Sequence, residues 1–235
     1  MQGQRAQRAK LARAVEWLRI NIPFLLTYFT ASIILALVYG CFESVYMNIV
    51  MGLFTSILAP YIGFIIHMFA HMFNFKREIY DRFSESSNCV LRIYLQCLTY
   101  YLDFHDKIHH DSKLGKQWMY IVLEAIQNIQ FQAMFFILLN TVVLRNVFNN
   151  SIINLWGLLY VTMHLVSFSL YKYNNHENHH ENKLTNFEPY IFDIIHGTTF
   201  EGDDAETSKE PWHFAIVNVV ILTALMVLVR KQKYI

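Results

Sequence analysis

Eight of the eleven histidines lie in three short clusters, which we call histidine boxes. Box 1 reads HMFAH, box 2 reads HDKIHH and box 3 reads HENHH, and each lies at or just beyond the end of an apolar stretch. Spacings of three and four residues put side chains on one face of a helix. Grouped neutral imidazoles are what a divalent transition metal needs from a protein. The residues are His67 and His71, then His105, His109 and His110, then His176, His179 and His180.

The number of imidazoles predicts more than one metal ion. Eight imidazoles exceed the roughly four to six ligands of one ion, so two ions are expected. A site of nitrogen ligands without thiolates suits iron that handles oxygen better than structural zinc, although zinc also accepts imidazole. For each box taken alone, a solvated loop or a metal-buffering segment is the alternative interpretation.

The bulk composition predicts that the elements around these boxes lie in a membrane. The chain has 235 residues, of which 54% are hydrophobic and 16% are charged, and its mean hydropathy is +0.26. A soluble domain usually carries about 25% charged residues. The net charge of +1 argues against a nucleic-acid-binding protein. The three cysteines, at spacings unlike a zinc ribbon or a disulfide framework, indicate reduced or buried thiols.

The apolar stretches predict an all-α integral membrane protein, a bundle of about four transmembrane helices with a possible fifth, C-terminal membrane segment. Residues 1–21 are expected to form a basic helix on the anionic cytosolic face, and residues 22–235 a single membrane domain. Pro60 must either kink the second stretch or leave it long enough to project past the bilayer. The stretches are 22–41, 45–73, 118–147, 152–173 and 212–229.

The charges between the stretches predict which side the boxes face. Residues 74–116 hold box 2 and are rich in lysine and arginine, which assigns them to the cytosol. If the first four stretches span, all three boxes face the cytosol. The C-terminal KQKYI matches a dilysine pattern that returns proteins to the endoplasmic reticulum. That pattern needs a cytosolic tail, whereas a fifth full span would put the tail in the lumen, and both possibilities stay open.

The boxes, their order and their membrane setting resemble the fatty acid hydroxylase/sterol desaturase superfamily of integral-membrane di-iron enzymes. The segment from box 3 onward, HENHHENKLTNFEPYIFDIIHGTTF, is similar to that family's HxxHH box and its aromatic-Asp-x-x-x-Gly-Thr ending. The sequence YVTMH resembles the family's intramembrane Tyr-x-x-x-His helix. The resemblance covers about residues 60–200 and is carried, besides the boxes, by Asn186, Phe187, Phe192, Asp193, Gly197, Thr198, Tyr160 and His164.

This resemblance implies O₂-dependent hydroxylation or desaturation of a C–H bond in a fatty acyl, sphingolipid or sterol substrate. It implies two iron ions, His164 as a ninth ligand, and a separate electron donor such as cytochrome b5, because the chain has no heme or flavin motif of its own. Three departures from the family pattern leave the subfamily open. Met68 replaces an arginine of box 1, box 2 has three residues rather than two before its His pair, and Phe168 replaces a histidine.

Several polar residues outside the boxes have open roles. Asp193 could orient a ligand histidine, cap a helix or form an ion pair. Polar side chains in the third apolar stretch could line a substrate cavity or join helices by hydrogen bonds. No carboxylate ligand is evident, and His196 and His213 are expected to be non-ligands. The polar residues of the third stretch are Glu124, Gln127, Asn128 and Gln132.

A second functional class competes with the enzyme: a non-catalytic, histidine-rich metal-binding or metal-transport membrane protein. Transporters place several ionisable residues in mid-span, and here only Glu124 and His164 qualify. The basic segment 74–116 and the acidic segment 201–210 are candidate docking surfaces for the electron donor. The substrate, the electron donor and the oligomeric state are not determined by the sequence.

Overall fold

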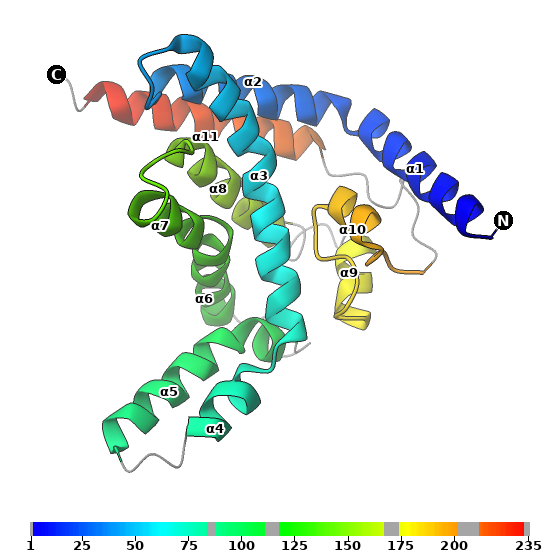
Figure 1. Cartoon of the computed structure of the whole chain (residues 1–235), viewed down its shortest axis with the longest axis vertical. Coiled ribbons are helices and arrows are strands. Elements are labelled where there is room, and N and C mark those ends of the chain that lie inside the picture. The colour runs from blue at the N-terminus through cyan, green and yellow to red at the C-terminus, as the bar shows by residue number, and fades with distance from the viewer. Residues whose placement is uncertain (1, 84–87, 111–117, 167–173, 202–211, 233–235) are drawn as a thin grey trace.

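The computed structural model is built of helices, and no strand occurs in residues 2–83, 88–110, 118–166, 174–201 and 212–232, which the structure describes (Figure 1). This confirms the all-α prediction. The α-helices are α1 Gln2–Ile20, α2 Ile22–Val38, α3 Val45–Met72, α4 Asp81–Phe83, α5 Cys89–Leu102, α6 Trp118–Ile129, α7 Phe135–Val142, α8 Asn150–Val166, α9 Asn174–Glu181, α10 Tyr190–His196 and α11 Trp212–Gln232. The π-helical turns in the described part of the chain are η1 Lys76–Tyr80, η2 His105–His109 and η3 Gln130–Met134.

Two or three segments have the length and apolar composition needed to cross a membrane. They are α3 and the continuous run α6–η3–α7 (Trp118–Val142), with a third if α1 and α2, bent by 69° at their junction, count as one broken span. The apolar part of α11, Phe214–Arg230, is shorter. The stretch predicted at 152–173 forms α8 as far as Val166, and its remainder lies outside the described residues.

Helix α3 resolves the two possibilities raised for Pro60. It continues through Pro60 as one helix of 28 residues. At about 1.5 Å per residue it is roughly 42 Å long, against a hydrocarbon core of about 30 Å. A helix of that length must tilt or project from a bilayer, and box 1 lies in its last two turns.

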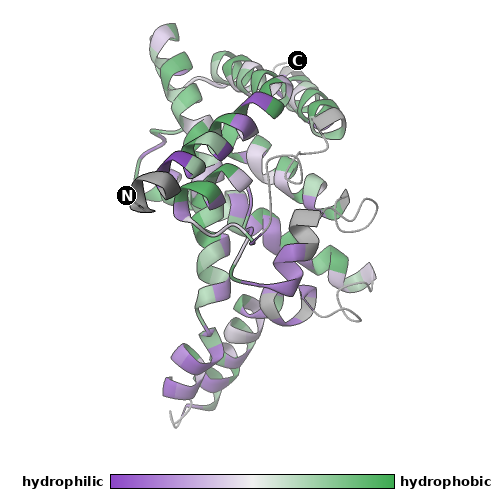
Figure 2. Cartoon of the chain, turned by 90° about the vertical axis from the view of Figure 1, so that its right-hand side faces the viewer, coloured by the Kyte–Doolittle hydropathy of each residue, from purple (hydrophilic) through white to green (hydrophobic). Residues whose placement is uncertain are grey.

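Helix α6 carries polar side chains on its inward face and apolar side chains on its outward face, the reverse of a surface helix in a water-soluble protein. Along α6, Val122, Leu123 and Ile126 are exposed, whereas Glu124 and Gln127 are buried. A polar stripe that faces the interior and an apolar face that points outward are typical of helices in lipid. Figure 2 shows mostly hydrophobic residues on the helices in the upper part of the molecule, except on the N-terminal helix, and more hydrophilic residues lower down.

Helix α8 lies at the centre, packed against α2, α3, α6, η3 and α11. Small residues let the neighbouring backbones approach closely. A Cβ on Gly157 of α8 would meet Ala133 at 2.5 Å, and one on Gly63 of α3 would meet the side chain of Gln132 at 1.8 Å. These close approaches draw α3, η3 and α8 together, and the ends of α3 and α8 carry His67, His71 and His164.

Helix α1 forms as predicted and packs against α10. Trp17 is buried against Tyr190 and Ile194, and the Lys10 ammonium donates to the carbonyl of Ile195 at 2.5 Å. The contact fixes one side of the segment that follows box 3. In Figure 1, α9 and α10 lie beside α3, on the side away from α6 and α7.

Candidate metal centre

The three histidine boxes, far apart in sequence, meet in one buried cluster. Box 1 comes from the end of α3, box 2 from η2 and the residue after it, and box 3 from α9. The Nε2 atom of His67 lies 3.0 Å from that of His105 and 3.2 Å from that of His71. The Nε2 atoms of His109 and His180 are 2.9 Å apart. The predicted convergence of the boxes is therefore present in the structure.

Each of these nitrogen separations is compatible with two ligands of a common ion. With metal–nitrogen bonds of about 2.0–2.1 Å, two ligands at right angles are about 2.9 Å apart and two tetrahedral ligands about 3.3 Å apart. The observed range of 2.9 to 3.2 Å falls between or on these values. The donor set fits a transition metal.

The cluster divides into two groups joined by a third. An all-imidazole group consists of His67, His71, His105 and His179, and a mixed group consists of His109, Glu124 and His164. His105, His109 and His110 connect them. Within each group, one ligand atom per residue lies within 4.8 Å of all the others. The all-imidazole and mixed groups share no residue, so the cluster offers more than one position for a metal.

Much of the cluster is buried, and burial favours the neutral form of several of its imidazoles. His179 is 0% exposed and His109 1%. Burial lowers the pKa of His105, His109 and His179, and with neighbouring imidazoles it lowers the pKa of His180 to about 3. A neutral imidazole is the form that binds a metal, so no proton competes for these nitrogens at neutral pH.

Box 2 is presented by a π-helical turn, which differs from the ordinary helix that its spacing predicts. The turn η2 spans His105 to His109. A π turn closes an i to i+5 hydrogen bond and so holds one residue more than an α turn. The rings of His105 and His109 stack at 4.9 Å, and both lie near the ring of His110, at 5.5 and 5.2 Å. The widened turn brings all three rings to the same side.

Two histidines of the all-imidazole group are held by backbone carbonyls from one short segment. His67 Nδ1 donates to the carbonyl of Phe187 at 2.7 Å, and His179 Nδ1 donates to that of Thr185 at 2.6 Å. A carbonyl oxygen can only accept, so in each neutral ring Nδ1 carries the proton and Nε2 offers a lone pair. Such outer contacts fix the tautomer and orientation of metal-binding histidines.

Asp193 organises that segment, which we call the brace loop (residues 185–200). Its carboxylate is buried and accepts from the backbone N–H groups of Phe187 and Glu188, both at 3.0 Å, and from the Thr198 hydroxyl at 2.6 Å. The loop is closed by a hydrogen bond from Asn186 N–H to the Thr198 carbonyl at 2.8 Å. Asp193 therefore positions the Phe187 carbonyl, and that carbonyl in turn orients the predicted ligand His67.

Glu124 takes one of the two roles left open for it, because it joins helices by hydrogen bonds, and both of its partners are predicted ligands. It accepts from His109 Nδ1 at 2.7 Å and from His164 Nε2 at 2.6 Å, and it is 2% exposed. The sequence marked Glu124 only as an ionisable residue in an apolar stretch. An ionisable residue in an apolar stretch is a useful indication of a functional site, because a buried charge in such a helix needs a partner. Its two partners come from η2 and α8, which the sequence does not bring together.

The neighbouring amides join helices, one of the two roles left open for them. Gln127 donates to the Tyr101 carbonyl at 2.5 Å. Gln132 donates to the Gly63 carbonyl at 3.4 Å and accepts from the Trp156 indole at 3.1 Å. Asn128 lies 3.5 Å from the Glu124 carboxylate. These contacts tie α6 and η3 to α3, α5 and α8 around the cluster.

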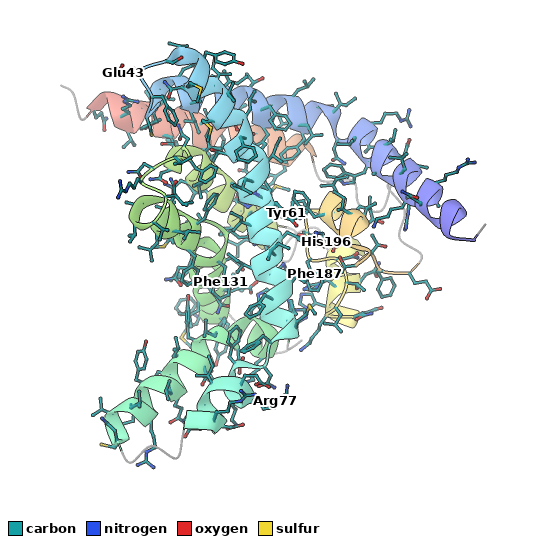
Figure 3. The ribbon with its side chains drawn as sticks, viewed as in Figure 1. Glu43, Tyr61, Arg77, Phe131, Phe187 and His196 are labelled. Atoms are coloured by element: carbon teal, nitrogen blue, oxygen red, sulfur yellow. The ribbon has the colours of Figure 1, made fainter. Side chains whose placement is uncertain are left out.

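Of the nine predicted ligands, eight have side chains that the structure describes, and all eight lie in the cluster. The side chain of His176 lies outside the described residues, as do Phe168, the acidic segment 202–210 and the side chain of His213. His196, expected to be a non-ligand, is exposed on α10 and faces Tyr61, 3.3 Å from its hydroxyl (Figure 3).

His110 gives a direct test of whether a metal fits. Both of its ring nitrogens are buried, and among the described residues neither has a hydrogen-bond partner. Burying polar atoms without a partner is unfavourable unless something else binds them. Its ring lies 4.8 Å from those of His71 and His179 and 4.5 Å from that of His180. A metal ion among these rings would satisfy the nitrogens.

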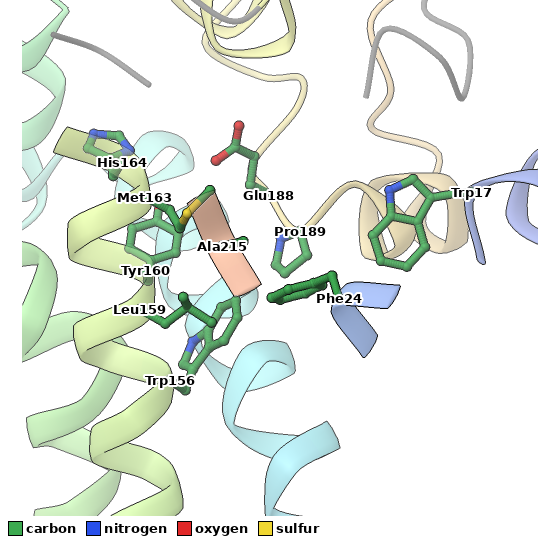
Figure 4. A pocket seen from close by; sticks show the side chains of 10 residues that line it. All are labelled: Trp17, Phe24, Trp156, Leu159, Tyr160, Met163, His164, Glu188, Pro189 and Ala215. Atoms are coloured by element: carbon green, nitrogen blue, oxygen red, sulfur yellow. The ribbon is translucent and has the colours of Figure 1, made fainter. Parts of the chain in front are cut away.

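An apolar pocket of about 60 Å³ opens beside the mixed group (Figure 4). The polar lining residues on α8 are His164 and Tyr160, and Glu188 and Pro189 of the brace loop lie opposite. The remaining wall is apolar and comes from four helices: Trp17, Phe24, Trp156, Leu159, Met163 and Ala215. The pocket could bring an apolar group to the histidine that contacts Glu124.

No family model, no curated protein and no solved structure matches this chain. The assignment of a function therefore depends on the residues of the site.

Proposed function

We propose that this chain is an integral-membrane di-iron oxidoreductase that uses O₂ to hydroxylate or desaturate a C–H bond of a lipid. The observation that carries the proposal is the convergence of three histidine boxes on one buried cluster with two separate groups of ligand atoms. The resemblance of the boxes and of the brace loop to the fatty acid hydroxylase/sterol desaturase superfamily supplies the reaction class.

The π turn removes one departure from that family's pattern. Box 2 has one residue more than the family's usual spacing, and η2 holds one residue more than an α turn. The additional residue thus leaves the three rings on one side of the chain. The spacing therefore does not weaken the proposal.

Iron, when bound, would supply the activation of O₂ and the abstraction of hydrogen. The protein's residues have three tasks. The brace loop and Glu124 orient the imidazoles, the buried cluster excludes water, and the pocket beside His164 positions the substrate. Because O₂ takes up four electrons and the C–H oxidation gives two, an external donor must supply the other two.

The size of the pocket favours a slender substrate. Its volume is about 60 Å³, whereas a cavity of about 150 Å³ is known to hold benzene. The pocket has room for only a short part of a substrate, such as a few methylene groups, and on this ground we propose a fatty acyl chain rather than a sterol. The chain would enter from the membrane between α2, α8 and α11, which line the pocket.

We further propose that α2, α3, α6–α7 and α8 cross the endoplasmic reticulum membrane and present the cluster to the cytosol. The exposed Arg77 and Arg82, which follow box 1 along the chain, suit an acidic donor such as cytochrome b5, although both already pair with Glu78. The acidic segment 202–210, which belongs to the other candidate docking surface, lies outside the described residues, and so does most of the KQKYI terminus.

The test is a comparison of lipids from cells that express this chain with lipids from cells that express His179→Ala. An added oxygen atom in a lipid indicates hydroxylation, and the loss of two hydrogens indicates desaturation. Purified protein should contain iron and consume O₂ when lipid and a reductant are added. Metal without any lipid product would favour the metal-binding or transport alternative, and protein that binds no metal would refute both.

A further inference from the structure

Glu124 occupies a position that an apolar helix rarely offers to a carboxylate. It lies in α6, part of a candidate membrane span, and is 2% exposed. The exposed residues of the same helix turn, Val122 and Leu123, are apolar. An ionisable side chain in such a setting is unfavourable unless it is paired, and it commonly marks a functional site.

Both oxygens of the carboxylate are engaged by imidazoles from different elements. Oε2 accepts from His109 on η2, and Oε1 accepts from His164 on α8. The two rings lie 4.9 Å apart. A single side chain thus ties together two predicted ligands that are 55 residues apart in sequence.

These two bonds fix which nitrogens can reach a metal. In the neutral His109 ring, Nδ1 carries the proton and Nε2 offers its lone pair, 2.9 Å from Nε2 of His180. His164 donates through Nε2, which leaves its lone pair on Nδ1. In the all-imidazole group, backbone carbonyls have this role for His67 and His179, so the carboxylate distinguishes the mixed group chemically.

We infer that Glu124 creates a second metal position, distinct from the all-imidazole position, by orienting His109 and His164 and by supplying a negative charge beside the ion. A carboxylate that accepts from the outer N–H of a metal-binding imidazole makes that imidazole a stronger donor than a neutral backbone carbonyl does. The two positions therefore bind the same metal with different affinities and give different spectra. Glu124 is in this sense a positioning residue for the second position.

The inference depends on the two-metal site of the proposed function, and a metal titration separates the two. The full chain, purified in detergent and stripped of metal, is titrated with Co²⁺ while its visible spectrum is recorded. The wild-type protein should bind two equivalents in two steps. Glu124→Gln should keep the first step, whereas its second step should weaken about 10- to 100-fold and lose its spectrum.

Three further variants complete the test. Gln127→Leu removes a buried polar side chain of α6 whose described bond is to a backbone carbonyl, and it should keep both steps. Glu124→Asp keeps the charge and should restore part of the second step, which a merely structural defect would not allow. His71→Ala should lose the first step and keep the second.

The inference is overturned if Glu124→Gln binds two equivalents with wild-type affinities and spectra, or if it weakens both steps equally. Failure of the proposed function would be seen elsewhere, in wild-type protein that binds no metal or oxidises no lipid. If wild type binds two ions but produces no lipid product, the inference about Glu124 stands and the enzymatic proposal falls.

Discussion

The all-imidazole group and the mixed group lie side by side, but different parts of the chain hold them. His67 and His179 are oriented by backbone carbonyls of the brace loop, whereas His109 and His164 are oriented by one carboxylate. The mixed group also lies against the apolar pocket, because His164 forms part of the pocket wall.

The difference shows where each group is vulnerable. A backbone carbonyl cannot be removed by substitution, so the support of His67 and His179 can be disturbed mainly through residues that shape the brace loop, and to a smaller extent through Tyr160, whose hydroxyl also contacts His67. The mixed group depends on a single side chain, so one substitution should release both of its histidines. The mixed group, whose histidines are held by a side chain that a substitution can change, is also the group beside the pocket.

The largest effect is expected from His105→Ala, because His105 belongs to the all-imidazole group and to the connecting group. Its removal should weaken metal binding at both positions, so the two groups would no longer differ in their response to a substitution. We expect bound metal to fall close to zero and lipid product to fall at least about 100-fold, more than for loss of an outer contact. Metal analysis of the purified protein and quantification of the product measure this. His196→Ala, which removes an exposed histidine on α10, should change neither, and the interpretation is wrong if the two variants behave alike.

Asp193→Asn should affect the all-imidazole group selectively. The amide cannot replace both carboxylate oxygens as acceptors, so the brace loop should loosen and the Phe187 carbonyl should shift from His67. We expect about 10- to 100-fold weaker binding at the first metal position, and a loss of about 1–3 kcal/mol of stability. Metal competition with a chelator and thermal unfolding provide the measurements. Asp81→Asn, at an exposed carboxylate, is the control, and equal weakening of both positions would contradict the selective role.

Met163→Trp should separate substrate binding from metal binding. The larger side chain would fill the pocket beside the mixed group while leaving Glu124 and His164 in place. Product formation should fall about 10-fold or more, with metal content unchanged. Met119→Trp places the same side chain on the outward face of α6 and should have no effect. A full rate in Met163→Trp would show that the substrate does not use this pocket.

The smallest effect is expected from Tyr160→Phe. The Tyr160 hydroxyl lies 3.3 Å from His67 Nδ1, and the ring stacks on His164 at 5.6 Å. Phenylalanine keeps the stacking and loses the hydrogen bond, a change of about 0.5–1.5 kcal/mol. The first metal position should weaken about 2- to 10-fold and the second should not change. Chelator competition on the two-step titration resolves this, and a shift in the second step alone would reverse the assignment.

The helices could be predicted from the sequence because their signals are local. Each of the five apolar stretches forms a helix in the part of the chain that the structure describes, and the helix through Pro60 is one of the two outcomes expected. The ligand histidines were also local, because spacings within a box are set by the helical turn. The widening of box 2 into a π turn was not predictable, since an α turn accommodates the same letters.

The sequence by itself determined the apolar helices, the histidine chemistry and the marked residues Glu124, His164 and Asp193. The tertiary structure alone decided what each of them contacts. Glu124 meets His109 and His164 across 15 and 40 residues, and Phe187 meets His67 across 120. Such contacts depend on how α3, α6 and α8 pack around Gly63 and Gly157 and on how Asp193 folds the brace loop. A residue's type limits the bonds that it can form, and only the packing of distant elements determines which of those bonds are formed.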